Sequence, residues 1–99
     1  MSERARAAAA ARGVAIEITD LGWWGPARLI AEYDPAGPVI RIDARERARA
    51  GDPLAHEEHA IAHELYHHLE RTGEVPRLAT RREREAAADA FARAFVNRA

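Results

Sequence analysis

Two histidines and a glutamate that could bind and use a metal ion stand together in the segment His63-Glu64-Leu65-Tyr66-His67. On a helix, residues four positions apart are separated by about 40° around the axis, so both imidazoles point to one side and can bind one zinc ion. Glu64 is rotated by about 100° from His63, which lets its carboxylate reach a zinc-bound water instead of becoming a ligand. The spacing therefore predicts zinc bound by His63 and His67, with Glu64 as the general base.

The other interpretation of this segment is a pair of solvated histidines on a polar helix face. The surrounding pattern favours the metal site, because the apolar residues of the predicted helix recur on the opposite face and leave the two histidines on a separate polar stripe. We expect these apolar residues to be buried: Leu54, Ile61, Leu65 and Leu69.

Three further histidines lie close to the segment. His56 and His59 fall on the same predicted helix face as His63, and His59 stands four residues before it. Ala60 follows His59, so this earlier pair lacks a glutamate that could act as a base. We interpret His56 and His59 as polar residues near the helix start, with substrate contact as the alternative, and we expect His68 on the surface.

A catalytic zinc usually has three protein ligands and one open position. Glu85 lies on the inward face of the last predicted helix, where a metal would offset the cost of burying a carboxylate. Asp89, one turn later, would accept the second N–H of a ligand histidine. The alternatives are a salt bridge from Glu85 to Arg81 or Arg82, and Glu70 as the third ligand. We expect Glu70 to fall too far along the helix.

The elements that must position these residues are predicted from capping and alternation patterns. Asp52-Pro53 is an N-cap followed by proline, so the metal-binding helix should run from there to about residue 71. Thr80 and Glu83 have the spacing of a capping box and should begin a last helix that runs almost to residue 99. Ahead of them we expect a helix over about residues 3–12, capped by Ser2, and a three-stranded sheet. Its strands would be Val14–Thr19, Ala27–Tyr33 and Val39–Asp43.

A chain of 99 residues has room for one hydrophobic core, so we expect a single α+β domain over residues 1–99. Trp23 and Trp24 stand next to glycines, and we expect them to be buried and to close this core. A recognition loop is the alternative for the two tryptophans.

Composition and charge narrow the function classes. The chain has 15 basic and 16 acidic residues, so no excess of positive charge indicates a nucleic-acid partner. There is no cysteine, so any zinc must be bound by imidazole and carboxylate. Residues 1–12 contain no run of large apolar residues, so we expect neither a signal peptide nor a membrane span, and a cytoplasmic protein is the default.

At the metal-binding residues the chain resembles the gluzincin metallopeptidases, whose pattern is HExxH followed by a glutamate helix of the type ExxxD. The resemblance is closest to the minigluzincins and to the metallopeptidase domain of the ImmA/IrrE family, with HELxH and, downstream, E-x-x-A-(D/N)-x-F-A. The downstream stretch here reads Glu85-Ala86-Ala87-Ala88-Asp89-Ala90-Phe91-Ala92. The order of elements also agrees over nearly the whole chain, although Tyr66 stands where ImmA/IrrE members commonly have glycine.

The resemblance implies a minimal zincin-like fold, with Glu85 as the third zinc ligand. It also implies that one strand of the sheet borders the cleft and pairs with an extended substrate, and Val39–Asp43 is the candidate for this strand.

Together these features predict a zinc metallo-endopeptidase that acts on a peptide or protein substrate. Zinc would polarise a water and the scissile carbonyl, while Glu64 takes the water's proton and later passes it to the leaving amine. Tyr66 or His59 could stabilise the oxyanion. Two alternatives stay open. One is a zinc-stabilised interaction module with little or no proteolysis, which by the resemblance could act on a transcription repressor. The other is a latent enzyme whose cleft is blocked by a chain terminus.

Overall fold

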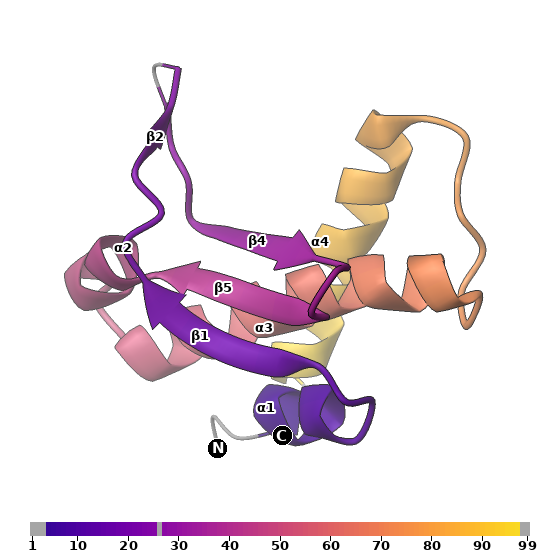
Figure 1. Cartoon of the computed structure of the whole chain (residues 1–99), viewed down its shortest axis with the longest axis horizontal. Coiled ribbons are helices and arrows are strands. Elements are labelled where there is room, and N and C mark those ends of the chain that lie inside the picture. Colours follow the sequence, from indigo (N-terminus) through magenta and orange to yellow (C-terminus); the bar gives the residue numbers. More distant parts are fainter. Residues whose placement is uncertain (1–3, 26, 98–99) are drawn as a thin grey trace.

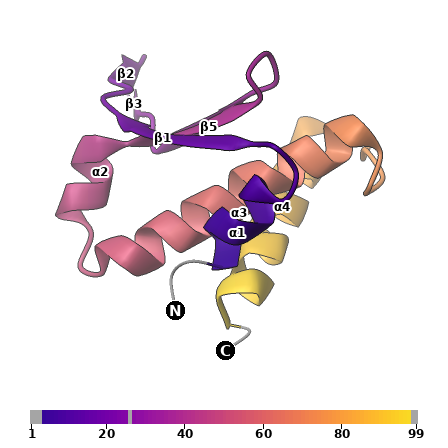
Figure 2. The same ribbon diagram turned by 60° about the horizontal axis from the view of Figure 1, so that its bottom comes forward.

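The computed structural model describes residues 4–25 and 27–97, and the side chains of all of these except Trp24, Ala27, Arg28 and Asn97 (Figure 1). A small sheet forms one layer of the molecule. Helices α1 (Arg4–Ala10), α3 (Pro53–Thr72) and α4 (Arg81–Asn97) form the other layer, and α2 (Ala44–Arg49) lies at one end (Figure 2). The predicted α+β class is therefore confirmed.

The central strand of the sheet is β5 (Val39–Asp43). It pairs in parallel with β1 (Ala15–Thr19) and in antiparallel with β4 (Ala31–Asp34). Three strands in one sheet were predicted, and this is confirmed. The choice of Val39–Asp43 as the strand that pairs with substrate is wrong, because β5 already bonds to a strand on each side. In the three-stranded sheet the outer strands are β1 and β4, and only their outer edges are left to accept another strand.

The predicted strand Ala27–Tyr33 is divided in the structure. β2 (Trp23–Trp24) and β3 (Ala27–Arg28) form a separate antiparallel hairpin, and β4 begins only at Ala31. The hairpin projects away from the sheet (Figure 1), and Trp23 is 66% exposed. A core position for Trp23 is therefore wrong, and the side chain of Trp24 lies outside the described residues.

The two long helices begin where their capping residues predict. The Asp52 side chain accepts a hydrogen bond from the Ala55 N–H, and Gly73 ends α3 in the left-handed conformation, at a φ of 86°. Thr80 and Glu83 form the capping box at the start of α4, each side chain accepting from the other's backbone N–H at 3.1 Å. Ser2, the predicted cap of the first helix, lies outside the described residues. None of the described helices combines the length and apolar character needed to cross a membrane.

The short helix α2 is not predicted from the sequence. Asp43 ends β5 and also caps α2, because its side chain accepts a hydrogen bond from the Glu46 N–H at 2.9 Å. The same carboxylate accepts from the Leu21 N–H at 2.8 Å and is fully buried. A single buried aspartate therefore joins the end of the sheet to α2 and to the segment that leads into the hairpin.

The core lies between the sheet and α3. Its largest fully buried apolar side chains are Ile40 and Ile42 from β5, and Ile61 and Leu65 from α3. Elsewhere the contacts between helices depend on alanine, since Ala5 and Ala9 of α1, and Ala88 and Ala92 of α4, are all fully buried. Small side chains let the helices approach closely, but each buries little apolar area.

Two expectations about α3 are wrong. Leu54 is 52% exposed, because it lies in the first turn, and the buried positions of the helix begin only at Glu57. His68, expected on the surface, is only 6% exposed. The physical reason is Tyr33 of β4, whose hydroxyl lies 2.6 Å from His68 Nδ1 and covers that side of the helix.

Candidate metal centre

Helices α3 and α4 pack against each other so that His63, His67 and Glu85 meet. The two histidines are one turn apart on α3, and Glu85 lies near the start of α4. His63 Nε2 is 3.1 Å from Glu85 Oε1, and His67 Nε2 is 3.0 Å from Glu85 Oε2. One ligand atom from each residue falls within 4.8 Å of the others. The structure therefore brings together the three residues that the sequence predicts as zinc ligands.

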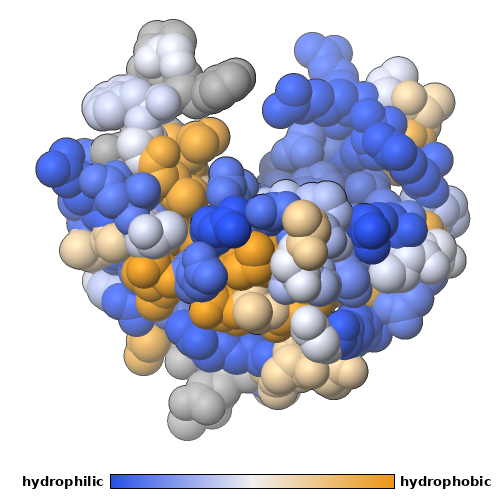
Figure 3. Space-filling view, viewed as in Figure 1, coloured by the Kyte–Doolittle hydropathy of each residue, from blue (hydrophilic) through white to orange (hydrophobic). Residues whose placement is uncertain are grey.

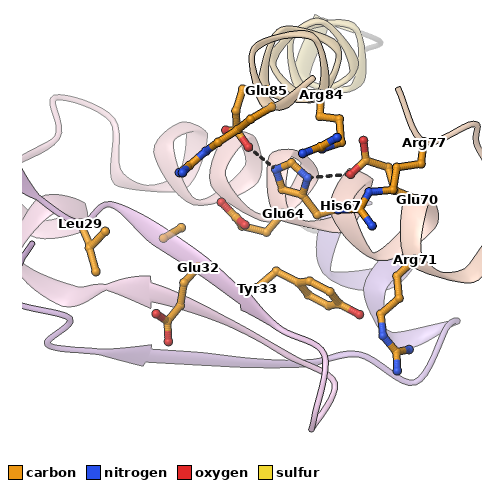
Figure 4. Close-up of a pocket in the computed structure, with 12 residues that line it drawn as sticks. Leu29, Glu32, Tyr33, Glu64, His67, Glu70, Arg71, Arg77, Arg84 and Glu85 are labelled. Atoms are coloured by element: carbon orange, nitrogen blue, oxygen red, sulfur yellow. Dashed lines mark hydrogen bonds and ion pairs between the residues drawn. The ribbon is translucent and has the colours of Figure 1, made fainter. Parts of the chain in front are cut away.

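The other ring nitrogen of each histidine also contacts a carboxylate. His63 Nδ1 lies 2.8 Å from Asp89 Oδ1, and His67 Nδ1 lies 3.0 Å from Glu70 Oε1. Figure 4 shows the His67 ring between Glu85 on one side and Glu70 on the other. A neutral imidazole has one N–H, so an Nδ1 that donates to its carboxylate leaves a lone pair on Nε2. Both Nε2 lone pairs then face the oxygens of Glu85.

Lone pairs and carboxylate oxygens repel each other unless a cation or additional protons lie between them. Tetrahedral zinc has ligands about 2.0 to 2.1 Å away, which places neighbouring ligand atoms about 3.3 Å apart. His63 Nε2 lies 3.1 Å from Glu85 Oε1, and His67 Nε2 lies 3.0 Å from the other oxygen, Oε2, so each histidine has one carboxylate oxygen at about that separation. Imidazole nitrogen and carboxylate oxygen are also ligand types that zinc prefers. The donor types therefore suit zinc, and the three residues lie close enough together to share one ion.

Glu64 lies beside this centre and is not part of the ligand group. Its side chain is 12% exposed, and its Oε2 lies 3.9 Å from His63 Nε2. Burial raises the pKa of the Glu64 carboxyl to about 7, and the negative charges of Glu85 and Glu32 act in the same direction. A bound dication would lower this pKa, because positive charge nearby favours the carboxylate form. With zinc bound, the carboxylate form of Glu64 would therefore be favoured, and a carboxylate beside the metal can accept a proton, which is the requirement for a general base.

No salt bridge among the described residues joins Glu85 to Arg81 or Arg82, the alternative partners considered for it. Glu70 is not directed at the candidate centre either, because its Oε1 contacts Nδ1 of His67, and it is the other ring nitrogen, Nε2, that contacts Glu85. Its position three residues after His67 is the helical spacing that brings two side chains together. That spacing is visible in the sequence, so the contact between Glu70 and His67 could have been predicted.

A second group of possible ligand atoms comes from His59, His63 and Asp89, and it shares His63 with the first group. Within this second group, Asp89 contacts His63 Nδ1. The Nε2 atoms of His63 and His67 are directed at Glu85 instead. Burial lowers the pKa of His59, so its imidazole is neutral at pH 7. His59 can therefore donate or accept a hydrogen bond next to the centre.

The candidate centre opens into a cleft between β4 and the two long helices. Two cavities of about 840 and 510 Å³ share Leu29, Ala31, Glu64 and Glu85. Figure 3 shows a deep notch between the hairpin side and the start of α4, with a hydrophilic wall on the α4 side. Beyond the shared residues, the larger cavity is lined by Glu32, Tyr33, His67, Glu70, Arg71, Arg77, Arg81 and Arg84. The smaller is lined by Ile30, His56, His59, Ala60, His63 and Asp89.

The residues proposed to stabilise an oxyanion are placed differently. His59 lines the smaller cavity, next to His63. Tyr66 lines neither cavity, and its ring packs against Phe91 of α4 with 5.4 Å between ring centroids. Tyr33 does line the cleft, but Figure 4 shows its hydroxyl pointing away from Glu85, in keeping with its bond to His68. The contact between Tyr33 and His68 joins residues 35 positions apart and has no local signal in the sequence.

The chain was compared with known families and proteins. No family model matches it, and the searches of curated proteins and of solved structures found no similar protein.

Proposed function

We propose that the chain is a zinc-dependent metallo-endopeptidase of the gluzincin type, with a minimal zincin-like fold. The observation that supports this most directly is the orientation of His63 and His67. Each has its Nδ1 atom on a carboxylate and its Nε2 atom on Glu85. Two histidines held in this way by separate partners are preorganised for one metal ion.

A zinc ion held there would supply a Lewis acid for the scissile carbonyl and lower the pKa of a water molecule. In this proposal His63, His67 and Glu85 hold the metal, while Asp89 and Glu70 fix the orientation of the two imidazoles. Glu64 takes a proton from the attacking water and passes it to the leaving amine. The free edge of β4, which borders the cleft, is the place where an extended peptide would add as a further strand.

The test begins with the metal content of the purified chain, for which we expect about one zinc per molecule. The zinc-loaded protein is then incubated with casein, and cleavage is followed by release of soluble peptides. Glu64→Gln keeps the size of the side chain but removes the base, so it should retain zinc and lose roughly 10² to 10⁴-fold in rate. A chain that binds no zinc would overturn the metal centre itself.

Zinc binding without any cleavage would point instead to a zinc-stabilised interaction module. In that case the wild type and Glu64→Gln would both be inactive on casein and on short peptides. Turnover that the Glu64→Gln variant retains above about a tenth of the wild-type rate would contradict the role of Glu64 as base.

A further inference from the structure

The larger cavity of the cleft is lined by four arginines that the proposed chemistry does not use. Arg71 follows Glu70 on α3, Arg77 lies in the loop before α4, and Arg81 and Arg84 lie in the first turn of α4. All four line the larger cavity together with His67 and Glu85. Figure 4 shows Arg77 and Arg84 on the α4 side of His67, and Figure 3 shows this side of the notch as hydrophilic.

Three of the four carboxylates that line the same cavity are bound to groups other than these arginines. Glu32 accepts a hydrogen bond from Arg41 at 2.9 Å, on the side of β4 that faces β5. Glu70 contacts His67, and Glu85 contacts both histidines. The fourth carboxylate, Glu64, lies 3.9 Å from His63 Nε2. The cavity therefore carries four glutamates and four arginines, and none of these glutamates forms an ion pair with one of these arginines.

No acidic side chain in the described part of the chain lies within ion-pair distance of Arg71, Arg77, Arg81 or Arg84. Arg84 is held in place by backbone oxygens, because its Nη1 donates to Leu78 O at 2.8 Å and to Ala79 O at 3.3 Å. Arg71 has a side-chain hydrogen bond with Tyr33. Arginines in a concave site that form no ion pair with its carboxylates can attract anionic groups of a ligand, because the guanidinium charge raises the local concentration of anions. A metal dication in the neighbouring centre would strengthen this positive field.

The other end of the cleft has a different character. Among the residues that the structure describes, no arginine lines the smaller cavity. Its lining combines four apolar residues with three histidines and three carboxylates: Leu29, Ile30, Ala31, Ala60, His56, His59, His63, Glu64, Glu85 and Asp89. Ala31 of β4 lines both cavities, whereas Tyr33, at the other end of the strand, lines only the arginine-rich one. An extended peptide along β4 would thus have one flank over the arginines and the other over the apolar residues.

We propose that this cleft selects peptides that carry acidic side chains on the flank lying over Arg71, Arg77, Arg81 and Arg84, and an apolar side chain on the other flank. This inference rests on the proposed peptidase function for its setting. It concerns binding, however, so it can be tested separately from hydrolysis.

The experiment uses zinc-loaded full-length Glu64→Gln, which should bind peptides without consuming them, and fluorescein-labelled peptides of ten residues. The peptides share one apolar centre and carry aspartates, asparagines or lysines on the N-terminal or the C-terminal flank, each with an amidated and a free C-terminus. Binding is measured by fluorescence anisotropy at low and at physiological salt. Parallel peptides with a quencher report cleavage by the wild-type chain.

We expect aspartates on one flank, and on that flank only, to improve binding roughly tenfold over asparagines at low salt, with a smaller gain at physiological salt. Arg77→Gln combined with Arg81→Gln should reduce this preference to within about twofold. The matched control is Arg45→Gln combined with Arg49→Gln, two exposed arginines of α2 outside both cavities, which should keep the full preference.

Equal affinity for aspartate, asparagine and lysine peptides would overturn the inference, as would a preference that survives the double substitution in the cleft. A preference that depends only on a free C-terminus would also overturn it, because the anion recognised would then be the terminal carboxylate. Acid-selective binding without cleavage by the wild type would support the inference while removing the proposed peptidase function. Cleavage without acid selectivity would leave that function in place and remove the inference.

Discussion

Each of the two central histidines is held through both of its ring nitrogens. The Nδ1 contacts come from Asp89 on α4 and from Glu70 on α3, and the Nε2 contacts converge on Glu85. An imidazole fixed in this way does not have to reorient before it binds a metal, so less rotational freedom is lost on binding. In the proposed zinc site the three carboxylates would therefore have two distinct roles, one as ligand and two as orienting groups.

These roles predict a ranking of zinc affinities. Glu85→Ala removes a ligand, so it should weaken zinc binding by far more than 100-fold. Asp89→Ala and Glu70→Ala each free one imidazole to rotate, so each should cost about 10- to 100-fold. From the sequence, Glu70 was expected to lie too far along the helix to be a ligand, and its contact with His67 gives it an orienting role in this ranking instead.

Competition with a chromogenic zinc chelator measures all three affinities under the same conditions. Glu74→Ala is a suitable control, because Glu74 forms only a surface pair with Arg12, at 2.9 Å. If Glu70→Ala were the most damaging of the variants, Glu70 would be the ligand, and the assignment of Glu85 would be wrong.

Tyr33 joins the sheet to α3 through a hydrogen bond to the buried His68, and its side chain also has a hydrogen bond with Arg71. Burial lowers the pKa of His68, so the imidazole is neutral at pH 7 and needs a hydrogen-bond partner. Tyr33→Phe removes that partner and should lower the free energy of unfolding by about 1 to 3 kcal/mol. Urea denaturation followed by circular dichroism measures the loss.

Tyr66→Phe is the matched control for Tyr33→Phe. Tyr66 packs against Phe91, and its hydroxyl has no hydrogen bond to any residue that the structure describes. Tyr66→Phe should therefore change the free energy of unfolding by less than about 0.5 kcal/mol. Equal losses for the two variants would mean that the bond between Tyr33 and His68 contributes nothing specific.

At the scale of elements, two buried glutamates attach the short helices to α3. Glu57 accepts hydrogen bonds from Arg6 of α1 at 2.6 Å and from Arg47 of α2 at 2.8 Å. Glu58 accepts from the backbone N–H of Ala5 at 3.1 Å. Helices of seven and six residues are too short to be stable alone, so these contacts help to hold them on the domain.

The paired Glu57 predicts a specific dependence of stability on pH. Its hydrogen bond from Arg6, supported by the one from Arg47, lowers the pKa of the Glu57 carboxyl below its ordinary value of 4.5 in the folded chain. A lowered pKa in the folded state stabilises the protein above the unfolded pKa, and this stabilisation is lost as the pH falls through the folded pKa. Glu57→Gln should therefore cost about 2 kcal/mol at pH 7 and progressively less below about pH 4.5.

Denaturation of the metal-free wild type and of Glu57→Gln, repeated from pH 7 down to pH 3, measures this difference. The metal-free protein is used because zinc binding is itself dependent on pH. A difference between the two chains that stays constant over this range would show that Glu57 acts through packing and not through its charge.

The elements with strong local signals were predicted well from the sequence. The start of α3 follows from Asp52 and Pro53, and the start of α4 from the capping box of Thr80 and Glu83. The division of the second predicted strand was missed, because residues 27–33 have the composition of one continuous strand. The sequence also gives no local sign that the central strand would be β5, since strand order depends on contacts between distant segments.

The same distinction applies to the candidate centre. His63, Glu64 and His67 could be identified because their spacing is local, and Glu85 with Asp89 because one helix turn separates them. The four arginines of the larger cavity come from α3, the following loop and α4, so only the folded chain shows that they share a cavity. The free edge of β4 at the cleft is also a property of the assembled sheet and not of any segment.

At the scale of the whole molecule, the candidate centre joins the two longest helices. The fully buried residues of the described part of α4 are two alanines, Ala88 and Ala92, and its phenylalanines Phe91 and Phe95 pack only partly buried against the core. No large apolar side chain in this part of α4 is fully buried, which limits the apolar area that the helix buries. A small domain with such a core has limited stability. A metal held by His63 and His67 on one side and by Glu85 on the other would connect α4 directly to α3.

Zinc should therefore raise the melting temperature of the chain markedly. A ligand that binds only the folded state adds about 2.7 kcal/mol when its free concentration is 100 times its dissociation constant. For a domain of this size, each kcal/mol raises the melting temperature by about 4 to 8 °C, so a shift of roughly 10 to 20 °C is expected. Thermal unfolding with buffered zinc and with a chelator measures this shift. Glu85→Ala should lose most of it, because the variant retains histidines on α3 alone, while Glu74→Ala should keep it. If zinc raised the melting temperature of Glu85→Ala as much as that of the wild type, the metal would not connect the two helices, and the bound ion would lie on α3 only.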